Sequence, residues 1–95
     1  MPNYLNLATS GVTFATRERA TAIATEVGSG DTLELSFDGV RVASPSFVDE
    51  LIGRLAATHK QAVITGLTPS LVDIVDGVIE RRRLKTRFKV MATIG

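Results

Sequence analysis

Two serines and two carboxylates lie within seven residues, and these side chains are the best placed in the chain to do chemistry. Ser44 and Ser46 follow a strand-like stretch and precede a helical pattern that contains Asp49 and Glu50. The first turn of a helix carries unpaired backbone N–H groups and the positive end of the helix dipole. A hydroxyl at this place can cap the helix, or it can accept a phosphoryl group that those N–H groups help to hold.

Both serines are candidates for the capping residue, and the sequence leaves two arrangements open. If Ser44 is the cap, Pro45 takes the first helical position, where proline is favoured. If Ser46 is the cap, Asp49 lies three residues later and can bond back to it. Either cap stabilises the helix by about 1 kcal/mol. The functional interpretation makes Ser46 a phosphoacceptor, with Asp49 and Glu50 opposing the added charge.

Asp49 and Glu50 are adjacent, so on a helix their side chains point about 100° apart and cannot work as a catalytic carboxylate pair. Negative charge in the first turn of a helix is favoured by the dipole. Arg17 lies near the start of an earlier helix, where the dipole disfavours a cation. We therefore expect it to pair with Asp38, Asp49 or Glu50, and direct contact of these charges with a partner is the other interpretation.

Other catalytic and ligand-binding patterns are absent from the sequence. It contains no phosphate-binding glycine loop, no nucleophile elbow and no metal-ligand spacing. The absence of cysteine excludes disulfides, thiolate metal sites and cysteine nucleophiles. His59, the single histidine, is expected on the surface near the end of the second helix. These observations predict a protein that is not an enzyme and needs no cofactor or metal.

The hydrophobic pattern predicts the elements that position these residues. Apolar residues that alternate or run together predict extended segments at 4–8, 12–14, 32–37, 40–42, 62–65 and 84–90. Helical spacing predicts three helices, beginning after Thr16, near Ser44 or Ser46, and after Thr68. The alternation predicts an α/β fold, a mixed and mainly parallel sheet of four to five strands packed with three helices. The first and last strands are candidates for antiparallel edges.

The composition fits a single globular domain over residues 1–95. Hydrophobic residues make up 44% of the chain and charged residues 22%, which excludes an intrinsically disordered class. The N-terminal residues lack the pattern of a signal peptide, and no apolar run reaches membrane-spanning length. We therefore expect a cytoplasmic protein that makes no use of a membrane.

The net charge of +1 conceals a basic C-terminal region. Six of the eleven basic residues lie there without an intervening acid: Arg81, Arg82, Arg83, Lys85, Arg87 and Lys89. Cations at a helix C-terminus and charges on an edge strand are the structural explanations. The alternative is a docking patch for an acidic protein surface or, less favoured, for nucleic acid.

The run from Phe37 to Leu55 resembles the core of the STAS domain, the fold of bacterial anti-sigma factor antagonists. Aligned through Gly39-Val40, Ser46 falls on the serine that partner kinases phosphorylate in that family. Residues 64–72 resemble the next strand-to-helix turn of the domain. Thr16-Arg17 together with residues 46–51 resembles a compact STAS-like family of unknown function. The similarity covers about residues 12–80.

The chain departs from the STAS pattern around this serine. Ser44 replaces an aspartate, Pro45 replaces a serine, and Phe47 replaces a glycine that leaves room around the phosphoacceptor. A bulky Phe47 either covers Ser46 or packs into the core, and the sequence leaves both outcomes open.

The resemblance implies a regulatory protein-binding module that docks through the Ser46 turn and the second helix. Its partner would be a histidine-kinase-like ATPase or a serine kinase, in sigma-factor or stress signalling. Phosphorylation of Ser46 would then weaken docking. The alternative function is a nucleic-acid-associated or toxin–antitoxin accessory protein that uses the basic C-terminal strand. The oligomeric state stays open, a homodimer included.

Overall fold

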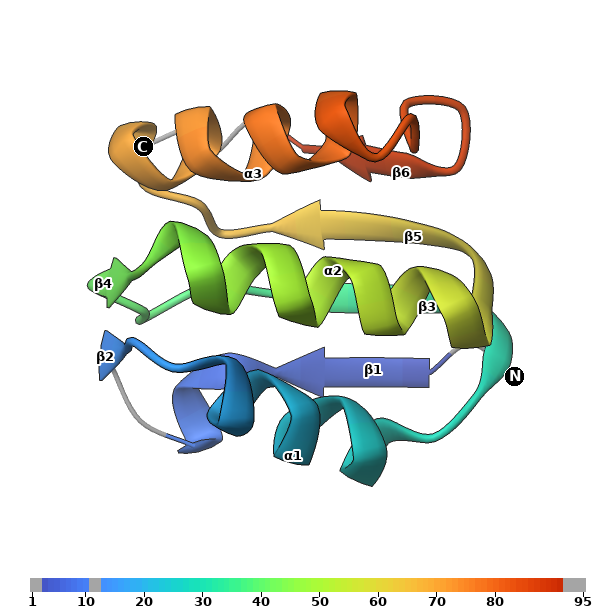
Figure 1. Cartoon of the computed structure of the whole chain (residues 1–95), viewed down its shortest axis with the longest axis horizontal. Helices are drawn as coiled ribbons and strands as arrows, with labels where there is room; N and C mark the ends of the chain where they lie inside the picture. The colour runs from blue at the N-terminus through green and yellow to red at the C-terminus, as the bar shows by residue number, and fades with distance from the viewer. Residues whose placement is uncertain (1–2, 11–12, 92–95) are drawn as a thin grey trace.

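Four parallel strands form the central sheet in the order β1-β3-β5-β6 (Figure 1). The computed structural model describes residues 3–10 and 13–91. The strands are β1 (Asn3–Asn6), β3 (Gly30–Ser36), β5 (His59–Thr65) and β6 (Phe88–Val90). The α/β fold with a mainly parallel sheet is thereby confirmed. The prediction that the first and last strands are antiparallel edges was wrong, since β1 and β6 both pair in parallel with their neighbours. A crossover precedes each new strand and returns the chain to the same end of the sheet.

Three helices cover one face of this sheet, and Figure 1 shows them side by side in front of the strands. They are α1 (Arg17–Val27), α2 (Pro45–Thr58) and α3 (Pro69–Arg81). Each crossover moves the chain one strand further in the same direction, so right-handed connections place all three helices on one face. The helix α2 lies in the middle and contacts both α1 and α3.

A second, two-stranded sheet sets the starts of α1 and α2 beside one another. It pairs β2 (Thr13–Phe14) in parallel with β4 (Val42–Ala43), after the short 3-10 helix η1 (Leu7–Ser10). The N–H of Ser44 extends the pairing by donating to the carbonyl of Phe14 at 2.8 Å. The expected extended pieces at 12–14 and 40–42 meet here, although Val12 lies outside the described residues. This pairing is what brings Arg17 close to the first turn of α2.

The hydrophobic core lies between the sheet and the helices. The strands contribute alternate side chains, and the helices contribute stripes at helical spacing. Fully buried residues include Leu33, Leu35, Phe47, Val48, Leu51, Ile52, Leu55, Ile64 and Val75. Among the described residues, no helix is both long enough and apolar enough to cross a membrane.

Two expectations about the C-terminal half were wrong. His59 is the first residue of β5 and only 3% exposed, because the chain enters the sheet directly from α2. The last strand spans Phe88–Val90 instead of 84–90. The residues before it form turns, in which the N–H groups of Arg87 and Phe88 both bond to the carbonyl of Leu84.

Candidate functional site

Ser44, not Ser46, caps α2. Its backbone is extended, and its Oγ accepts a hydrogen bond from the N–H of Phe47 at 3.1 Å. The same hydroxyl donates to the carbonyl of Ala15 at 3.0 Å, which ties the cap to the segment before α1. Pro45 takes the first helical position, where proline is favoured. The alternative cap, with Ser46 bonded to Asp49, does not form.

This arrangement leaves Ser46 exposed on the first turn of α2. The structure gives its hydroxyl no hydrogen-bond partner among the described residues. The N–H groups of Phe47 and Val48 are already bonded to Ser44, and Pro45 has none. Only the N–H of Ser46 therefore lacks a partner in this turn among the residues that the structure describes. We call residues 44–47 the Ser46 turn.

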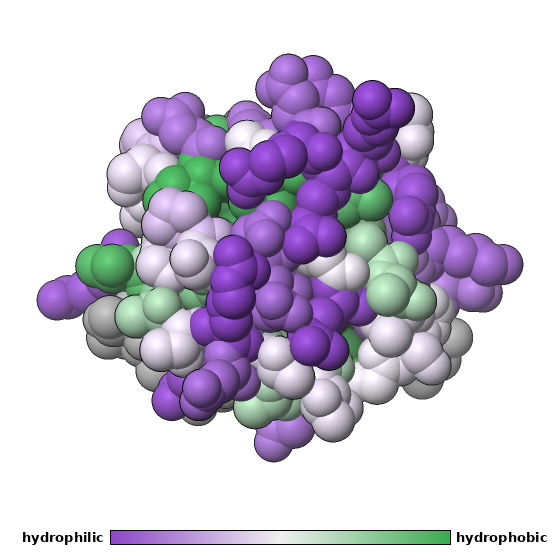
Figure 2. All heavy atoms as spheres, viewed as in Figure 1, coloured by the Kyte–Doolittle hydropathy of each residue, from purple (hydrophilic) through white to green (hydrophobic). Residues whose placement is uncertain are grey.

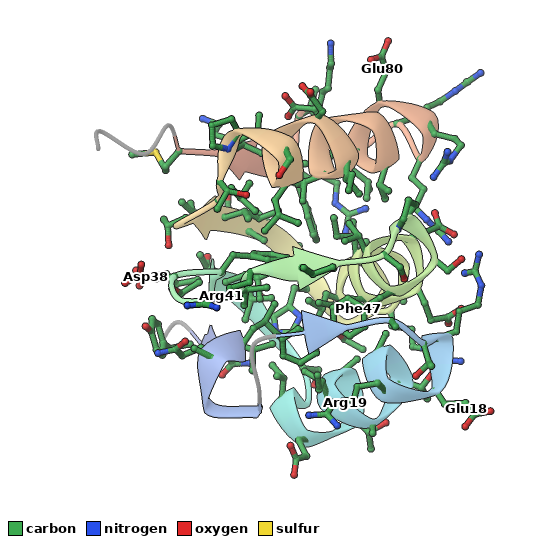
Figure 3. All side chains as sticks on the ribbon, turned by 90° about the vertical axis from the view of Figure 1, so that its left-hand side faces the viewer. Glu18, Arg19, Asp38, Arg41, Phe47 and Glu80 are labelled. Carbon is green, nitrogen blue, oxygen red and sulfur yellow. The ribbon has the colours of Figure 1, made fainter. Side chains whose placement is uncertain are left out.

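Phe47 packs into the core and does not cover Ser46. Its side chain is fully buried, and its ring lies 4.9 Å from that of Phe14 at an angle of 30°. The guanidinium of Arg19 stands over the other ring at 5.4 Å. Figure 3 shows Phe47 inside the molecule, whereas Arg19 comes from α1. The aromatic residue that replaces the family's glycine therefore leaves the serine accessible.

Arg17 pairs with both carboxylates of α2, which confirms two of its three candidate partners. Its Nη1 lies 3.2 Å from Asp49 Oδ2 and 3.3 Å from Glu50 Oε1. Glu50 also binds Arg54, one turn later, at 2.6 Å. Asp38 is not a partner of Arg17, because it lies in the loop after β3 and projects outward (Figure 3).

Asp49 is also bound from the other side by α3. Arg82 donates from Nε to Oδ1 at 3.0 Å and from Nη2 to Oδ2 at 3.2 Å, and Arg81 approaches Oδ1 at 3.5 Å. The hydrogen bonds from Arg82, together with those from Arg17, lower the pKa of Asp49 to about 2, although burial opposes the shift. The pairing in turn raises the pKa of Arg82. Asp49 is thus ionised at neutral pH and its charge is compensated.

The contact between Arg82 and Asp49 escaped the sequence reasoning because 33 residues separate the two side chains. One signal for it exists in Gly53, one turn after Asp49 on the same helix. A Cβ atom at Gly53 would lie 2.6 Å from Cζ of Arg82, so the guanidinium occupies the space that a side chain would take. Figure 2 shows that hydrophilic residues gather across the layer of helices.

A second hydroxyl occupies the equivalent place on α3. Thr68, Pro69, Ser70 and Leu71 repeat the pattern of residues 44–47. Thr68 caps the helix by accepting from the N–H of Leu71 at 3.4 Å, and Ser70 is exposed. Unlike Ser46, Ser70 lies within hydrogen-bond distance of its cap, 3.3 Å from Thr68 Oγ1. Ser70 is therefore the natural internal control for Ser46.

The six basic residues of the C-terminal region do not share one surface. Arg81 and Arg82 bind Asp49, whereas Arg87 turns back to the end of α2 and donates to the carbonyls of Ala56 and His59 at 2.7 Å. Lys85 and Lys89 line a separate groove. Arg83 takes a left-handed backbone conformation with φ of 59° at the end of α3. Arg87 therefore connects α2 to the start of β5 and is not one of the solvent-facing charges that were expected on an edge strand.

His59 joins three elements from its buried position. Its Nδ1 lies 3.1 Å from the carbonyl of Leu55 and 3.0 Å from Thr58 Oγ1, and its Nε2 lies 3.0 Å from Asn3 Nδ2. The Asn3 amide also donates to the carbonyl of Ser29 at 3.1 Å. These contacts give His59 a structural role. Among residues 3–10 and 13–91, no group of three or more metal-ligating side chains comes together.

Comparison with known proteins found a matching family model. Residues 20–70 match the family model described as a STAS-like domain of unknown function (DUF4325). The matched region spans most of α1, all of β3, β4, α2 and β5, and the start of α3. No curated protein and no solved structure matches the chain.

Proposed function

Because this chain belongs to the STAS-like domain family of unknown function, we propose that it is a non-enzymatic regulatory module that binds a partner protein. The proposed docking surface is the Ser46 turn together with Asp49, Glu50 and Arg54 of α2. By analogy with the anti-sigma factor antagonists that the chain resembles, the partner is a histidine-kinase-like ATPase or a serine kinase.

One observation carries this proposal, the uncommitted hydroxyl of Ser46. A serine that capped the helix would be tied to backbone N–H groups, but Ser44 performs that function here. The buried ring of Phe47 fixes the turn from below, so Ser46 is held outward on a rigid element. An exposed and unbonded hydroxyl on a fixed helix start is accessible to the active site of a kinase.

The ion pairs of α2 support a preformed surface. Asp49 contacts side chains from α1 and α3, so the outward residues of α2 are held in place before any partner arrives. A partner then loses less conformational freedom when it binds. The arginines around Asp49 and Glu50 also reduce the repulsion that these carboxylates would exert on a phosphoryl group at Ser46.

Phosphorylation of Ser46 is the proposed switch. A phosphoserine carries a charge of about −2 at neutral pH. Within the described part of the chain, one backbone N–H of the first turn is unpaired, so the helix start offers little to hold this charge. The charge therefore faces the partner. We expect the modification to weaken docking by electrostatic repulsion and desolvation, without a rearrangement of the module.

The test is incubation of the full chain with each candidate ATPase or kinase and Mg-ATP, followed by intact mass and peptide mapping. We expect one phosphoryl group, located on Ser46. Ser46→Ala should abolish it, and Ser70→Ala, the matched control, should retain it. Modification of Ser70 alone, or of no residue with any partner, would contradict the proposed switch.

Docking is tested separately from the switch. The unmodified chain, immobilised through its N-terminus, is exposed to the same candidate ATPases, and retention is compared with that on Arg54→Glu and Lys60→Glu surfaces. Arg54 lies on the outward side of α2, whereas Lys60 lies beyond its end and is 85% exposed. Loss of retention only with Arg54→Glu supports the proposed face, and equal retention on all three surfaces contradicts it.

A further inference from the structure

A groove of about 1540 Å³ runs beside α3 and β6, and no residue of the Ser46 turn lines it. Its apolar lining comes from Leu67, Val72, Phe88, Val90 and Met91. The loop that holds Asp38 and Arg41 also lines it, and Figure 3 labels both side chains. Sites for small molecules enclose about 300–1,000 Å³. The larger and open groove is better suited to a peptide segment.

The strand β6 borders this groove and forms an edge of the sheet. The carbonyl of Arg87 and the N–H of Met91 bond to β5, at 2.9 and 2.8 Å. In a parallel ladder successive residues direct their backbone groups to alternate sides, so Lys89 faces β5 whereas Phe88 and Val90 face outward. The N–H of Phe88 bonds to Leu84 at 2.7 Å, but the N–H of Val90 has no partner among the described residues. The edge therefore offers unpaired backbone groups to an added strand.

The two sides of this edge differ in chemistry. Phe88 and Val90 belong to the core side, where Val72 of α3 also lines the groove. Lys89 points to the opposite face of the sheet, in register with Val63 and Glu34. An added strand would therefore present alternate residues to an apolar wall and to a lysine. The complementary partner strand alternates apolar with acidic residues.

A second copy of this chain does not fit the same edge. Two-fold pairing of β6 with its copy would run antiparallel and bring Lys89 and its image together on one face. Lys85 borders the groove together with Asp38, Asp73 and Asp76, so the repulsion between two copies comes from Lys89. Like charges on paired strands are destabilising, and lysines on an edge strand are a recognised protection against self-pairing. Lys89 also attracts an acidic strand.

We propose that the edge of β6 binds an extended segment of a partner protein in which apolar and acidic residues alternate. The segment would add a strand to the sheet, with its apolar side chains between Val72 and Phe88 and its acidic side chains toward Lys89. This surface is distinct from the Ser46 turn, so it gives the module a second contact that phosphorylation of Ser46 leaves unchanged.

The test uses a blocked seven-residue peptide in which glutamate alternates with valine, titrated into the full chain by calorimetry. We expect binding with a Kd of about 100 µM or tighter. Val90→Pro removes the outward N–H without touching a bond to β5, since proline is tolerated at such edge positions. It should weaken binding at least about tenfold. Circular dichroism and urea unfolding establish that the variant is folded.

A charge exchange provides the second readout. Lys89→Glu should no longer bind the acidic peptide and should instead bind a peptide in which lysine alternates with valine. Lys60→Glu, which makes the same change in net charge, should keep the preference of the wild type for the acidic peptide. Absence of peptide binding, or equal binding by Val90→Pro, would overturn the proposal. A dimer that Val90→Pro makes monomeric in sedimentation would also overturn it, because a second copy would then occupy the edge.

Discussion

Arg82 binds Asp49 through two parallel hydrogen bonds, from Nε to Oδ1 at 3.0 Å and from Nη2 to Oδ2 at 3.2 Å. Its guanidinium lies over Gly53 and so connects the end of α3 to the first turns of α2. Arg17 of α1 reaches the same carboxylate at 3.2 Å. One carboxylate therefore links the three helices that support Ser46.

Removal of this carboxylate should destabilise the fold. Asp49 is 18% exposed, so its pairing is screened less than that of a surface ion pair. We expect Asp49→Ala to lower the free energy of unfolding by about 1–2 kcal/mol and a double-mutant cycle with Arg82→Ala to give a coupling of about 1 kcal/mol. Urea denaturation measures both. Asp31→Ala removes the ion pair with Lys60, whose side chains are 84% and 85% exposed, and should change the free energy of unfolding little. An equal loss of stability in this variant would contradict the greater contribution of the Asp49 pairs.

The same pairing predicts how stability depends on acid. The pKa of Asp49 is lowered from 3.8 to about 2 in the folded chain, so the unfolded state binds the proton first as the pH falls. The contribution of Asp49 is therefore complete above about pH 4 and is lost as the pH falls toward 2. Allowing for partial exposure, the loss is about 1–2 kcal/mol. Asp49→Asn should remove this part of the pH dependence in urea titrations, and an unchanged slope would contradict the assignment.

Gly53 should behave differently with and without Arg82. Replacing a glycine inside a helix by alanine normally stabilises by about 1 kcal/mol. In this chain the new Cβ would lie 2.6 Å from the guanidinium and displace it from Asp49. We expect Gly53→Ala to gain clearly less in the wild type than in an Arg82→Ala background, as measured by urea unfolding of the four chains. An equal gain in stability in both backgrounds would contradict the position of the Arg82 guanidinium over Gly53.

Two glycines with positive φ separate backbone strain from steric contact. Gly66 has φ of 74°, and a Cβ there would lie 2.5 Å from the backbone nitrogen of Asp38. Gly28 has φ of 77°, but a Cβ would meet no atom within 4 Å. Gly28→Ala should cost about 1 kcal/mol from strain, and Gly66→Ala clearly more because the loop after β3 must move. Similar melting temperatures for the two variants would contradict the close contact of these loops.

Local patterns in the sequence were sufficient to predict the helices and much of the sheet. Thr16 and Thr68 cap their helices as predicted, because a capping hydroxyl acts on an N–H only three residues away. The choice between Ser44 and Ser46 stayed open because both satisfy the same local rule. The carbonyl of Ala15, supplied by the pairing of β2 with β4, provides a second contact for Ser44.

Long-range contacts account for what the sequence did not reveal. His59 follows α2 directly, but its ring contacts Asn3, 56 residues away. Arg87 resembled one of several lysines and arginines on a strand, yet its contacts are carbonyls at the end of α2. Of the three partners predicted for Arg17, Asp49 and Glu50 were right and Asp38 was wrong, since an unfavourable charge at a helix start calls for a partner but does not say which carboxylate is near. Nothing local indicated that Arg82 would join the same carboxylate.

The most direct test of the account is the affinity of the partner ATPase for three forms of the full chain, measured by calorimetry: wild type, Ser46→Glu and Ser70→Glu. Both variants add one negative charge at the same position of a helix, on α2 and on α3. We predict that Ser46→Glu weakens binding at least about tenfold and that Ser70→Glu binds like the wild type. Equal affinity for all three forms, or a loss confined to Ser70→Glu, would contradict docking through the Ser46 turn.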